Sequence, residues 1–181
     1  MGISALPDPI DGYRRCFIAL GSNLGDRLGN LALAAQELTK VEGVKDVRLS
    51  PVYETAPWGR TDQPWYLNAV AESTCRLGPF ELLDRVKEIE KRLGRIPGTR
   101  WGPRLVDLDI LLLGDLWLRC GRLNIPHIDL QRRRFVLTPL ADLDPGLVLP
   151  DGVVITELLA KLPTEPAVRP FGRLDGHPPT D

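Results

Sequence analysis

Apolar residues along the chain recur at two spacings, and segments of the two kinds alternate. Apolar residues three or four positions apart predict two helices, one capped by Asp26 and one that starts at Pro79 and ends at Gly94. Short apolar or alternating runs predict four strands, at 16–20, 47–53, 66–74 and 106–113. The order β-α-β-β-α-β is typical of a ferredoxin-like α+β fold, an antiparallel sheet with helices packed on it.

The two ends of the chain and two loops lie outside this pattern. We expect a flexible lead over residues 1–14, one domain over residues 15–162 and a proline-rich flexible tail over residues 163–181. Glycine, proline and tryptophan interrupt residues 56–65 and 95–104, where no regular element fits. We interpret these two loops as lids that close over bound ligands and exclude water.

Composition narrows the class of protein. The 181 residues suit a single domain, and 23 basic against 24 acidic side chains give a net charge of -1. A general nucleic-acid binder needs a positive excess, so no nucleic acid is expected as a partner. Without a long apolar run or a signal peptide, we expect a cytoplasmic protein that makes no membrane contact. Three cysteines without a CxxC spacing indicate neither a disulfide framework nor a zinc site.

Asp107 and Asp109 are the first candidates for chemistry. Strand side chains alternate, so both should point to one face with Cα atoms roughly 6.5 Å apart, while Leu108, Ile110 and Leu112 face the core. Carboxylates with no nearby cysteine or histidine suit Mg²⁺, and a pair at this spacing can bridge two metal ions for phosphoryl transfer. The plainer alternative is two solvated aspartates, or partners of the nearby arginines.

Arginines in the preceding loop favour the metal interpretation. Arg95, Arg100 and Arg104 all precede the aspartate pair, and guanidinium groups bind phosphate oxygens and stabilise charge on a transferring group. Trp101 adds a flat apolar face. A solvated charged loop is the alternative, although arginines beside paired carboxylates assemble metal and phosphate ligands together.

Three further groups carry weaker signals. His127 and the arginines at 132–134 could hold a nucleotide, although such a histidine is more often structural and an arginine run is usually solvated. Tyr66 and Asn68 share a strand face, where a ring can stack on a heterocycle and an amide can read its polar edge. The turn at 21–26 matches no phosphate-binding motif, so it is interpreted as structural and a P-loop kinase is not expected.

With these residues in place, the sequence resembles the 6-hydroxymethyl-7,8-dihydropterin pyrophosphokinases of folate biosynthesis. The resemblance runs from about Phe17 to Gly152, and it rests on several segments that occur in order and at matching spacings. They are LGSNLGD at 20–26, YETAP at 53–57, DQPWYLN at 62–68, RWGPR at 100–104 with Asp107-Leu108-Asp109, and Pro126-His127 with Arg133 and Phe135.

The resemblance implies a ferredoxin-like fold and transfer of pyrophosphate from the co-substrate ATP to the pterin's hydroxymethyl oxygen, with release of AMP. It implies two Mg²⁺ ions at Asp107 and Asp109, with Arg95 and Arg104 completing the catalytic group. Small molecules are the only partners expected, and the chain is expected to be a monomer. The implied pterin contacts are Thr55, Trp58, Tyr66, Asn68, Trp101 and Phe135. The implied ATP contacts are Glu90, Arg100, Ile110, His127 and Arg133.

Three positions depart from the family's pattern. The loop between Arg95 and Trp101 has no lysine, whereas some members carry one that contacts ATP phosphate. Lys87 stands where a glutamine can occur, and Ile128 follows the histidine where proline or tyrosine is common. The metal pair is unaffected by these departures.

Two other functions are alternatives to the pyrophosphokinase. A ferredoxin-like RNA-binding module would need exposed aromatic residues on the sheet with basic flanks, and the net charge and the in-strand aspartates argue against it. A metal-dependent hydrolase could use the same aspartates to cut ATP or a phosphoester with water, and it would ignore pterins.

Overall fold

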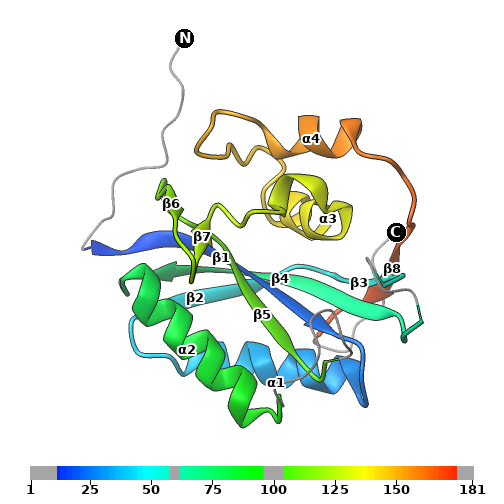
Figure 1. The fold of residues 1–181 in the computed structure, drawn as a ribbon, viewed down its shortest axis with the longest axis horizontal. Coiled ribbons are helices and arrows are strands. Elements are labelled where there is room, and N and C mark those ends of the chain that lie inside the picture. The colour runs from blue at the N-terminus through cyan, green and yellow to red at the C-terminus, as the bar shows by residue number, and fades with distance from the viewer. Residues whose placement is uncertain (1–11, 58–61, 96–103, 175–181) are drawn as a thin grey trace.

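A computed structural model describes residues 12–57, 62–95 and 104–174 of the chain. It contains two sheets and five helical segments within these ranges (Figure 1). The elements are β1 (Arg14–Ser22), α1 (Arg27–Thr39), β2 (Val44–Leu49), β3 (Val52–Thr55), β4 (Tyr66–Cys75), α2 (Pro79–Arg92), β5 (Asp107–Leu113), β6 (Leu118–Arg119), β7 (Asn124–Ile125), the 3₁₀ helix η2 (Leu130–Arg132), α3 (Arg134–Leu143), α4 (Ile155–Lys161) and β8 (Val168–Gly172).

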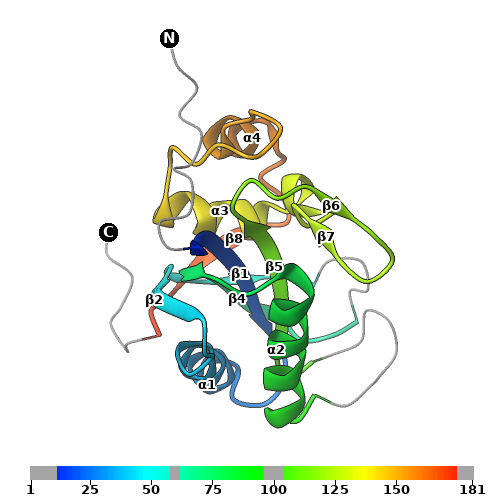
Figure 2. The ribbon, with the colours of Figure 1, turned by 90° about the vertical axis from the view of Figure 1, so that its left-hand side faces the viewer.

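The main sheet has six strands and only antiparallel pairings. Its order is β5-β1-β4-β3-β8, and β2 pairs with the other half of β4. Helices α1 and α2 cover one face, and α3 and α4 lie over the other (Figures 1 and 2). The predicted α+β, ferredoxin-like arrangement is therefore confirmed.

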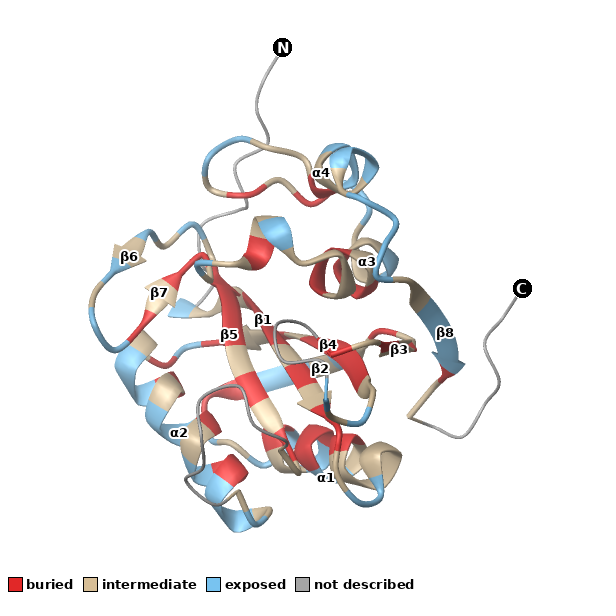
Figure 3. Cartoon of the chain, turned by 45° about the vertical axis from the view of Figure 1, so that its right-hand side comes forward, coloured by how far each residue is buried: buried red, intermediate tan, exposed pale blue. Residues whose placement is uncertain are grey.

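Each face of the sheet has its own hydrophobic core, which explains why the central strands are apolar on both sides (Figure 3). In β1, Ile18 packs into the core beneath α1 and α2, whereas its neighbour Phe17 packs into the core beneath α3. The first core also holds Leu31 from α1 and Leu82 from α2, and the second holds Leu137 from α3. No described helix is long and apolar enough to cross a membrane.

The predicted helix ends are confirmed by their local contacts. The Gly29 amide donates to the Asp26 carboxylate at 3.0 Å, which satisfies one of the free amides at the start of α1. Pro79 begins α2, where the missing N–H costs nothing. Gly94 has a φ of +88°, a left-handed conformation that ends the helix and favours glycine.

The single strand expected at 47–53 is instead two strands, β2 and β3, separated at Ser50 and Pro51. Pro51 has no N–H for the ladder, and the Ser50 hydroxyl accepts the Val70 amide at 2.9 Å. Both strands still pair with β4. The break therefore changes the pairing only locally.

The expectation of a loosely attached tail after residue 162 is wrong for residues 168–172, which form β8 at the edge of the sheet. β8 pairs antiparallel with β3, with Val168 opposite Thr55. An edge strand tolerates a proline such as Pro170, and β3 would otherwise present unpaired backbone groups. Residues 175–181 and 1–11 lie outside the described part of the chain.

A β-bulge changes which residues of β5 face each core. Phe17 pairs with Leu112 and Ile18 with Ile110, so Leu111 is the extra residue. Leu108 and Ile110 pack beneath α1 and α2 as predicted, but Leu112 lies with Leu111 in the opposite core. The predicted orientation of Leu112 is wrong because period-two alternation stops at the bulge.

Candidate active site

A cavity of about 320 Å³ opens on the sheet face that carries α3. Its walls come from β1, β3, β4, β5 and the segment 127–136. Nine predicted site residues line it together: Thr55, Tyr66, Asn68, Arg104, Asp107, Asp109, His127, Arg133 and Phe135. Trp58, Arg100 and Trp101 lie outside the described residues, as do the central parts of both predicted lids.

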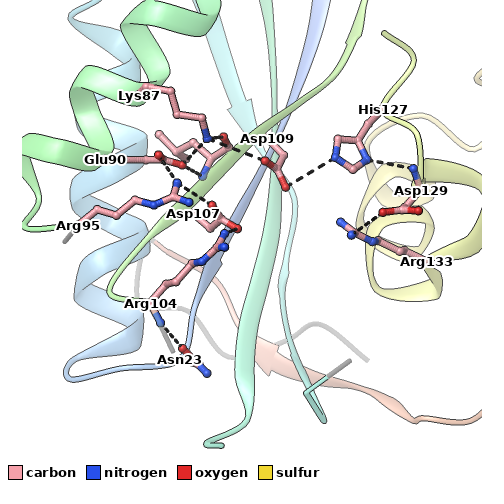
Figure 4. A network of polar contacts seen from close by, with 11 residues as sticks. Asn23, Lys87, Glu90, Arg95, Arg104, Asp107, Asp109, His127, Asp129 and Arg133 are labelled. Atoms are coloured by element: carbon pink, nitrogen blue, oxygen red, sulfur yellow. Dashed lines mark hydrogen bonds and ion pairs between the residues drawn. The ribbon is translucent and has the colours of Figure 1, made fainter. Parts of the chain in front are cut away.

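The cavity has two chemically different ends. A network of ion pairs surrounds the start of β5, and we call it the charged end (Figure 4). Arg104, Asp107 and Asp109 line the cavity, and Lys87, Glu90 and Arg95 complete the network next to it. We call Thr55, Tyr66, Asn68 and Phe135 the neutral end.

Asp107 is held by two arginines from the preceding loop. Its carboxylate lies 2.9 Å from Arg95 Nη1 and 2.6 Å from Arg104 Nη1. Its Oδ1 atom is buried, and apart from the ion pair with Arg95 it makes no hydrogen bond to the described residues. An oxygen in this state keeps lone pairs available to a cation.

Asp109 is more open than Asp107. Its Oδ1 lies 4.0 Å from Lys87 Nζ, and its Oδ2 lies 3.9 Å from His127 Nε2, both beyond hydrogen-bond distance. Figure 4 shows this carboxylate between the lysine and the histidine. The side chains of Asp107 and Asp109 share one face, as strand alternation predicts, and both line the cavity.

His127 reaches the cavity from the segment that follows β7. Its amide donates to the Leu111 carbonyl at 2.9 Å, which ties this segment to β5. Its Nδ1 accepts the Asp129 amide at 3.2 Å, so in the neutral ring the Nε2 hydrogen points toward Asp109. Burial lowers the pKa of His127, although Asp109 opposes that effect.

Glu90 is the most deeply buried carboxylate of the charged end, with 2% of its side chain exposed. It accepts the Leu108 amide at 2.7 Å and Lys87 Nζ at 2.8 Å, and it pairs with Arg95. Burial raises the pKa of Glu90, and the nearby Lys87 lowers it. Its contacts hold β5 and Arg95 in place, and it does not line the cavity.

Ile110 has its side chain in the core on the face opposite Asp109. Any ligand contact of Ile110 must therefore come from its backbone. Among the described strands, β5 pairs with β1 on one side and with no strand of the main sheet on the other. On the unpaired side of β5, the Leu108 amide donates to Glu90 and the Leu108 carbonyl accepts from Lys87. Because backbone groups alternate between the two sides of a strand, the amide and carbonyl of Ile110 also point to this unpaired side.

The neutral end is organised by one buried hydrogen bond. Asn68 Nδ2 donates to Thr55 Oγ1 at 2.8 Å, which fixes the orientation of the amide. A side chain at Gly21 would place its Cβ 3.5 Å from Asn68 Oδ1 and 4.0 Å from the Tyr66 ring. Glycine therefore keeps this part of the cavity floor open. Phe135 lines the same cavity from the start of α3.

Asn23 is a residue whose role sequence reasoning missed. It is 1% exposed, and its amide Nδ2 donates to Gln63 Oε1 at 3.1 Å and to the Pro64 carbonyl at 3.2 Å. Its Oδ1 accepts the Arg104 amide at 2.7 Å. The turn interpreted as merely structural thus joins the ends of both loops beside the cavity. The sequence signal that could have indicated this role is the position of Asn23 within the LGSNLGD motif.

Lys87 is the second residue whose role was missed, because the sequence indicated only a departure from a family pattern. It projects from α2 and contacts Glu90, the Leu108 carbonyl and, more distantly, Asp109. Helical spacing explains its contact with Glu90 three residues later. Its contacts with β5 depend on how α2 packs against the sheet.

Comparison with known proteins shows the family of this chain. Residues 17–145 match the model of the 7,8-dihydro-6-hydroxymethylpterin-pyrophosphokinase family. The chain belongs to this family. Two relatives named 2-amino-4-hydroxy-6-hydroxymethyldihydropteridine pyrophosphokinase support the assignment. The one from Pseudomonas aeruginosa is 45% identical over 84% of this chain and 94% of its own length, and the one from Methylorubrum extorquens is 43% identical over 82% and 93%.

The family assignment confirms the predicted enzyme class and reaction, a transferase that moves pyrophosphate from ATP to the hydroxymethyl pterin in folate biosynthesis. Among solved structures, Plasmodium falciparum HPPK-DHPS A437G superimposes with a TM-score of 0.64 at 15% identity. This match covers 82% of the chain but 45% of the longer Plasmodium chain, and at this identity it supports the fold alone.

Proposed function

We propose that this pyrophosphokinase binds the pterin at the neutral end of the cavity and the ATP phosphates with Mg²⁺ at the charged end. The observation that carries the proposal is the shared cavity. Asp107 and Asp109 line it together with Tyr66, Asn68 and Phe135, although these residues are far apart in the sequence. A cavity of about 320 Å³ is within the usual range for a small-molecule site.

The donor set at the charged end fits Mg²⁺. Two carboxylates on one strand face supply hard oxygen ligands, and the buried Oδ1 of Asp107 has no hydrogen bond. The described residues contain no group of three or more His, Cys, Asp or Glu side chains that could hold a metal alone. Phosphate oxygens and water must therefore complete the coordination, as is usual for Mg²⁺, and we propose two ions.

The neutral end suits the pterin ring. Tyr66 and Phe135 offer aromatic faces on which a flat heterocycle can stack. Asn68, held by Thr55, presents a fixed amide that can read the donors and acceptors on the ring's polar edge. We assign Trp58 and Trp101 to the same substrate from the family pattern.

The ATP contacts divide into direct and indirect ones. Arg104 lines the cavity, and both Arg104 and Arg95 carry guanidinium groups that phosphate oxygens can engage in place of Asp107. His127 and Arg133 line the cavity at the edge of β5, where the Ile110 backbone faces outward. Glu90 acts by holding Arg95, and we assign Arg100 to ATP from the family pattern.

The reaction follows from placing the two substrates in one cavity. The pterin's hydroxymethyl oxygen bonds to the β-phosphorus of ATP, and the bond from that phosphorus to the bridging oxygen of the α-phosphate breaks. AMP leaves with this oxygen, and the hydroxyl proton is lost. Mg²⁺ bound at this end supplies positive charge that offsets the charge developing on the transferred group. The arginines add to this effect, and alignment of the two substrates lowers the barrier further.

Radiolabelled ATP tests the proposal. The protein is mixed with Mg²⁺, 6-hydroxymethyl-7,8-dihydropterin and ATP labelled at the γ-phosphate or, in a parallel reaction, at the α-phosphate. We expect the γ label in the pterin product and the α label in AMP. Omitting the pterin is the control, and AMP formation should then stop.

Other product patterns would contradict the proposal. Release of labelled phosphate or pyrophosphate at the same rate without pterin would indicate the metal-dependent hydrolase instead. Transfer of the γ label to the pterin with formation of ADP would indicate an ordinary kinase.

A further inference from the structure

The charged end contains a cation that the reaction described above does not use. Lys87 Nζ donates to Glu90 Oε1 at 2.8 Å and to the Leu108 carbonyl at 2.9 Å, and it lies 4.0 Å from Asp109 Oδ1 (Figure 4). These contacts place its ammonium group between α2 and the outer edge of β5. From there it faces Asp109, the more open of the two cavity aspartates.

Lys87 brings the charges of this end into balance. Among the described residues, three carboxylates stand against three cations within one network of ion pairs. The carboxylates belong to Glu90, Asp107 and Asp109, and the cations to Lys87, Arg95 and Arg104. Without Lys87 the same network would carry one net negative charge.

We propose that Lys87 is a positioning residue that weakens divalent-metal binding to the nucleotide-free enzyme by balancing the charge around Asp109. A metal ion approaching a neutral cluster gains little long-range attraction, and Asp109 already faces a cation. Nucleotide phosphates add the negative charge that the cluster lacks, so the metal is retained together with ATP. This inference rests on the metal role proposed above for Asp107 and Asp109.

Binding of Mn²⁺ to the nucleotide-free protein tests this role without any enzymatic reaction. The fraction of free Mn²⁺, measured by electron paramagnetic resonance, gives the dissociation constant for each variant. Lys87→Gln keeps hydrogen-bonding groups, Lys87→Met keeps the apolar stem, and Lys87→Arg keeps the charge. We expect Lys87→Gln and Lys87→Met to bind Mn²⁺ about tenfold more tightly, because one unit charge about 4 Å away in a well-screened site has an effect of this order. Lys87→Arg should bind like the unchanged protein.

Arg85 provides the matched control for net charge. It lies on the same helix but is half exposed, and its ion pairs within the described residues are with Glu81 and Glu88, at 4.0 and 3.7 Å. Arg85→Gln should leave Mn²⁺ binding unchanged. Equal tightening in Arg85→Gln and Lys87→Gln would overturn the proposal, since the effect would then reflect overall charge.

A purely structural lysine gives a different result from a charge-balancing one. If Lys87 only ties α2 to β5, its removal leaves Mn²⁺ binding unchanged or weakens it, and either outcome overturns the proposal. Asp109→Asn separates this failure from failure of the proposed metal site. If Asp109→Asn weakens Mn²⁺ binding and Lys87→Gln does not change it, the role of Lys87 is rejected and the metal site is kept. Unchanged binding in Asp109→Asn rejects the metal site and the role of Lys87 together.

Discussion

The two ends of the cavity hold their side chains by different interactions. At the neutral end, a single hydrogen bond of 2.8 Å from Asn68 to Thr55 orients the amide, and aromatic rings form the walls. At the charged end, Asp107 is paired with Arg95 and Arg104, and Asp109 stands 4.0 Å from Lys87 and 3.9 Å from His127.

This difference indicates how each end responds to its ligand. At the neutral end, the Arg133 guanidinium lies over the Phe135 ring, 5.8 Å from its centroid, so the proposed pterin would exchange with this one contact when it stacks on Phe135. The hydrogen bond from Asn68 to Thr55 would stay in place. A metal ion or a phosphate at the charged end must exchange with ion pairs already formed there. If the ligands bind as proposed, binding at this end should depend on charge, whereas binding at the other end should depend on shape and hydrogen bonding.

The largest expected effect comes from Asp109→Ala. Removing a proposed metal ligand should lower the rate of AMP formation by about 10³-fold or more. Because the described ion pairs of the Asp109 carboxylate span about 4 Å, the free energy of unfolding should change by less than about 1 kcal/mol. AMP assays and urea unfolding measure the two effects. Asp115→Ala, at an exposed position in the turn after β5, is the control and should keep full activity. Substantial turnover by Asp109→Ala would contradict the proposal that Asp109 is a metal ligand.

Asn68→Ala tests the neutral end and should mainly weaken binding of the pterin. The substitution removes an amide that is 8% exposed and leaves the Thr55 hydroxyl without its partner. The KM for the pterin should rise about 10- to 100-fold, which corresponds to about 1–3 kcal/mol for an unmade buried hydrogen bond. The KM for ATP should not change. Thr74→Ala, at the other end of the same strand, is the control. An equal rise in both KM values would mean that the two ends are not independent.

Phe135→Ala should also raise the KM for the pterin, by less than Asn68→Ala does. Loss of one stacking face should raise the KM for the pterin about threefold to tenfold, in line with the usual strength of aromatic pairs. Steady-state kinetics with varied pterin measures this change. Phe80→Ala, at a position on α2 that is 41% exposed, removes a ring far from the cavity and should have no effect. An unchanged KM in Phe135→Ala would exclude stacking on this ring.

His127 should produce the smallest effect, a pH dependence of stability. Burial lowers its pKa below the ordinary value of 6.5, so the unfolded chain binds this proton more readily than the folded chain. The free energy of unfolding should therefore fall as the pH drops from about 6.5 toward the lowered pKa of the folded state.

Urea unfolding between pH 7.5 and pH 5 measures this change. His127→Asn keeps an acceptor near the position of Nδ1 and should reduce the loss of stability. His177→Asn, which changes the other histidine of the chain, is the comparison. Equal slopes in His127→Asn and the unchanged protein would show that His127 does not cause the effect.

Much of the fold could be predicted because its signals are local. The caps at Asp26 and Gly94 and the period-two alternation around Asp107 involve neighbours along the chain, and the structure confirms them. The break at Pro51 and the bulge at Leu111 were not predicted, although both lie within segments predicted to be strands. Each of them interrupts the apolar pattern of a strand over only one or two residues. A prediction made from the pattern over a longer segment does not detect so short an interruption.

The candidate site shows the same division between local and distant information. The sequence by itself determined that two carboxylates share a strand face, that arginines precede them and that the chain has the motifs of its family. Only the tertiary structure decided that Lys87 and Glu90 of α2 meet the edge of β5, that Asn23 joins two loops and that β8 completes the sheet. The physical reason is that alternation and capping act over a few residues. Ion pairs and strand pairing depend instead on segments brought together when both faces of the sheet bury their apolar residues.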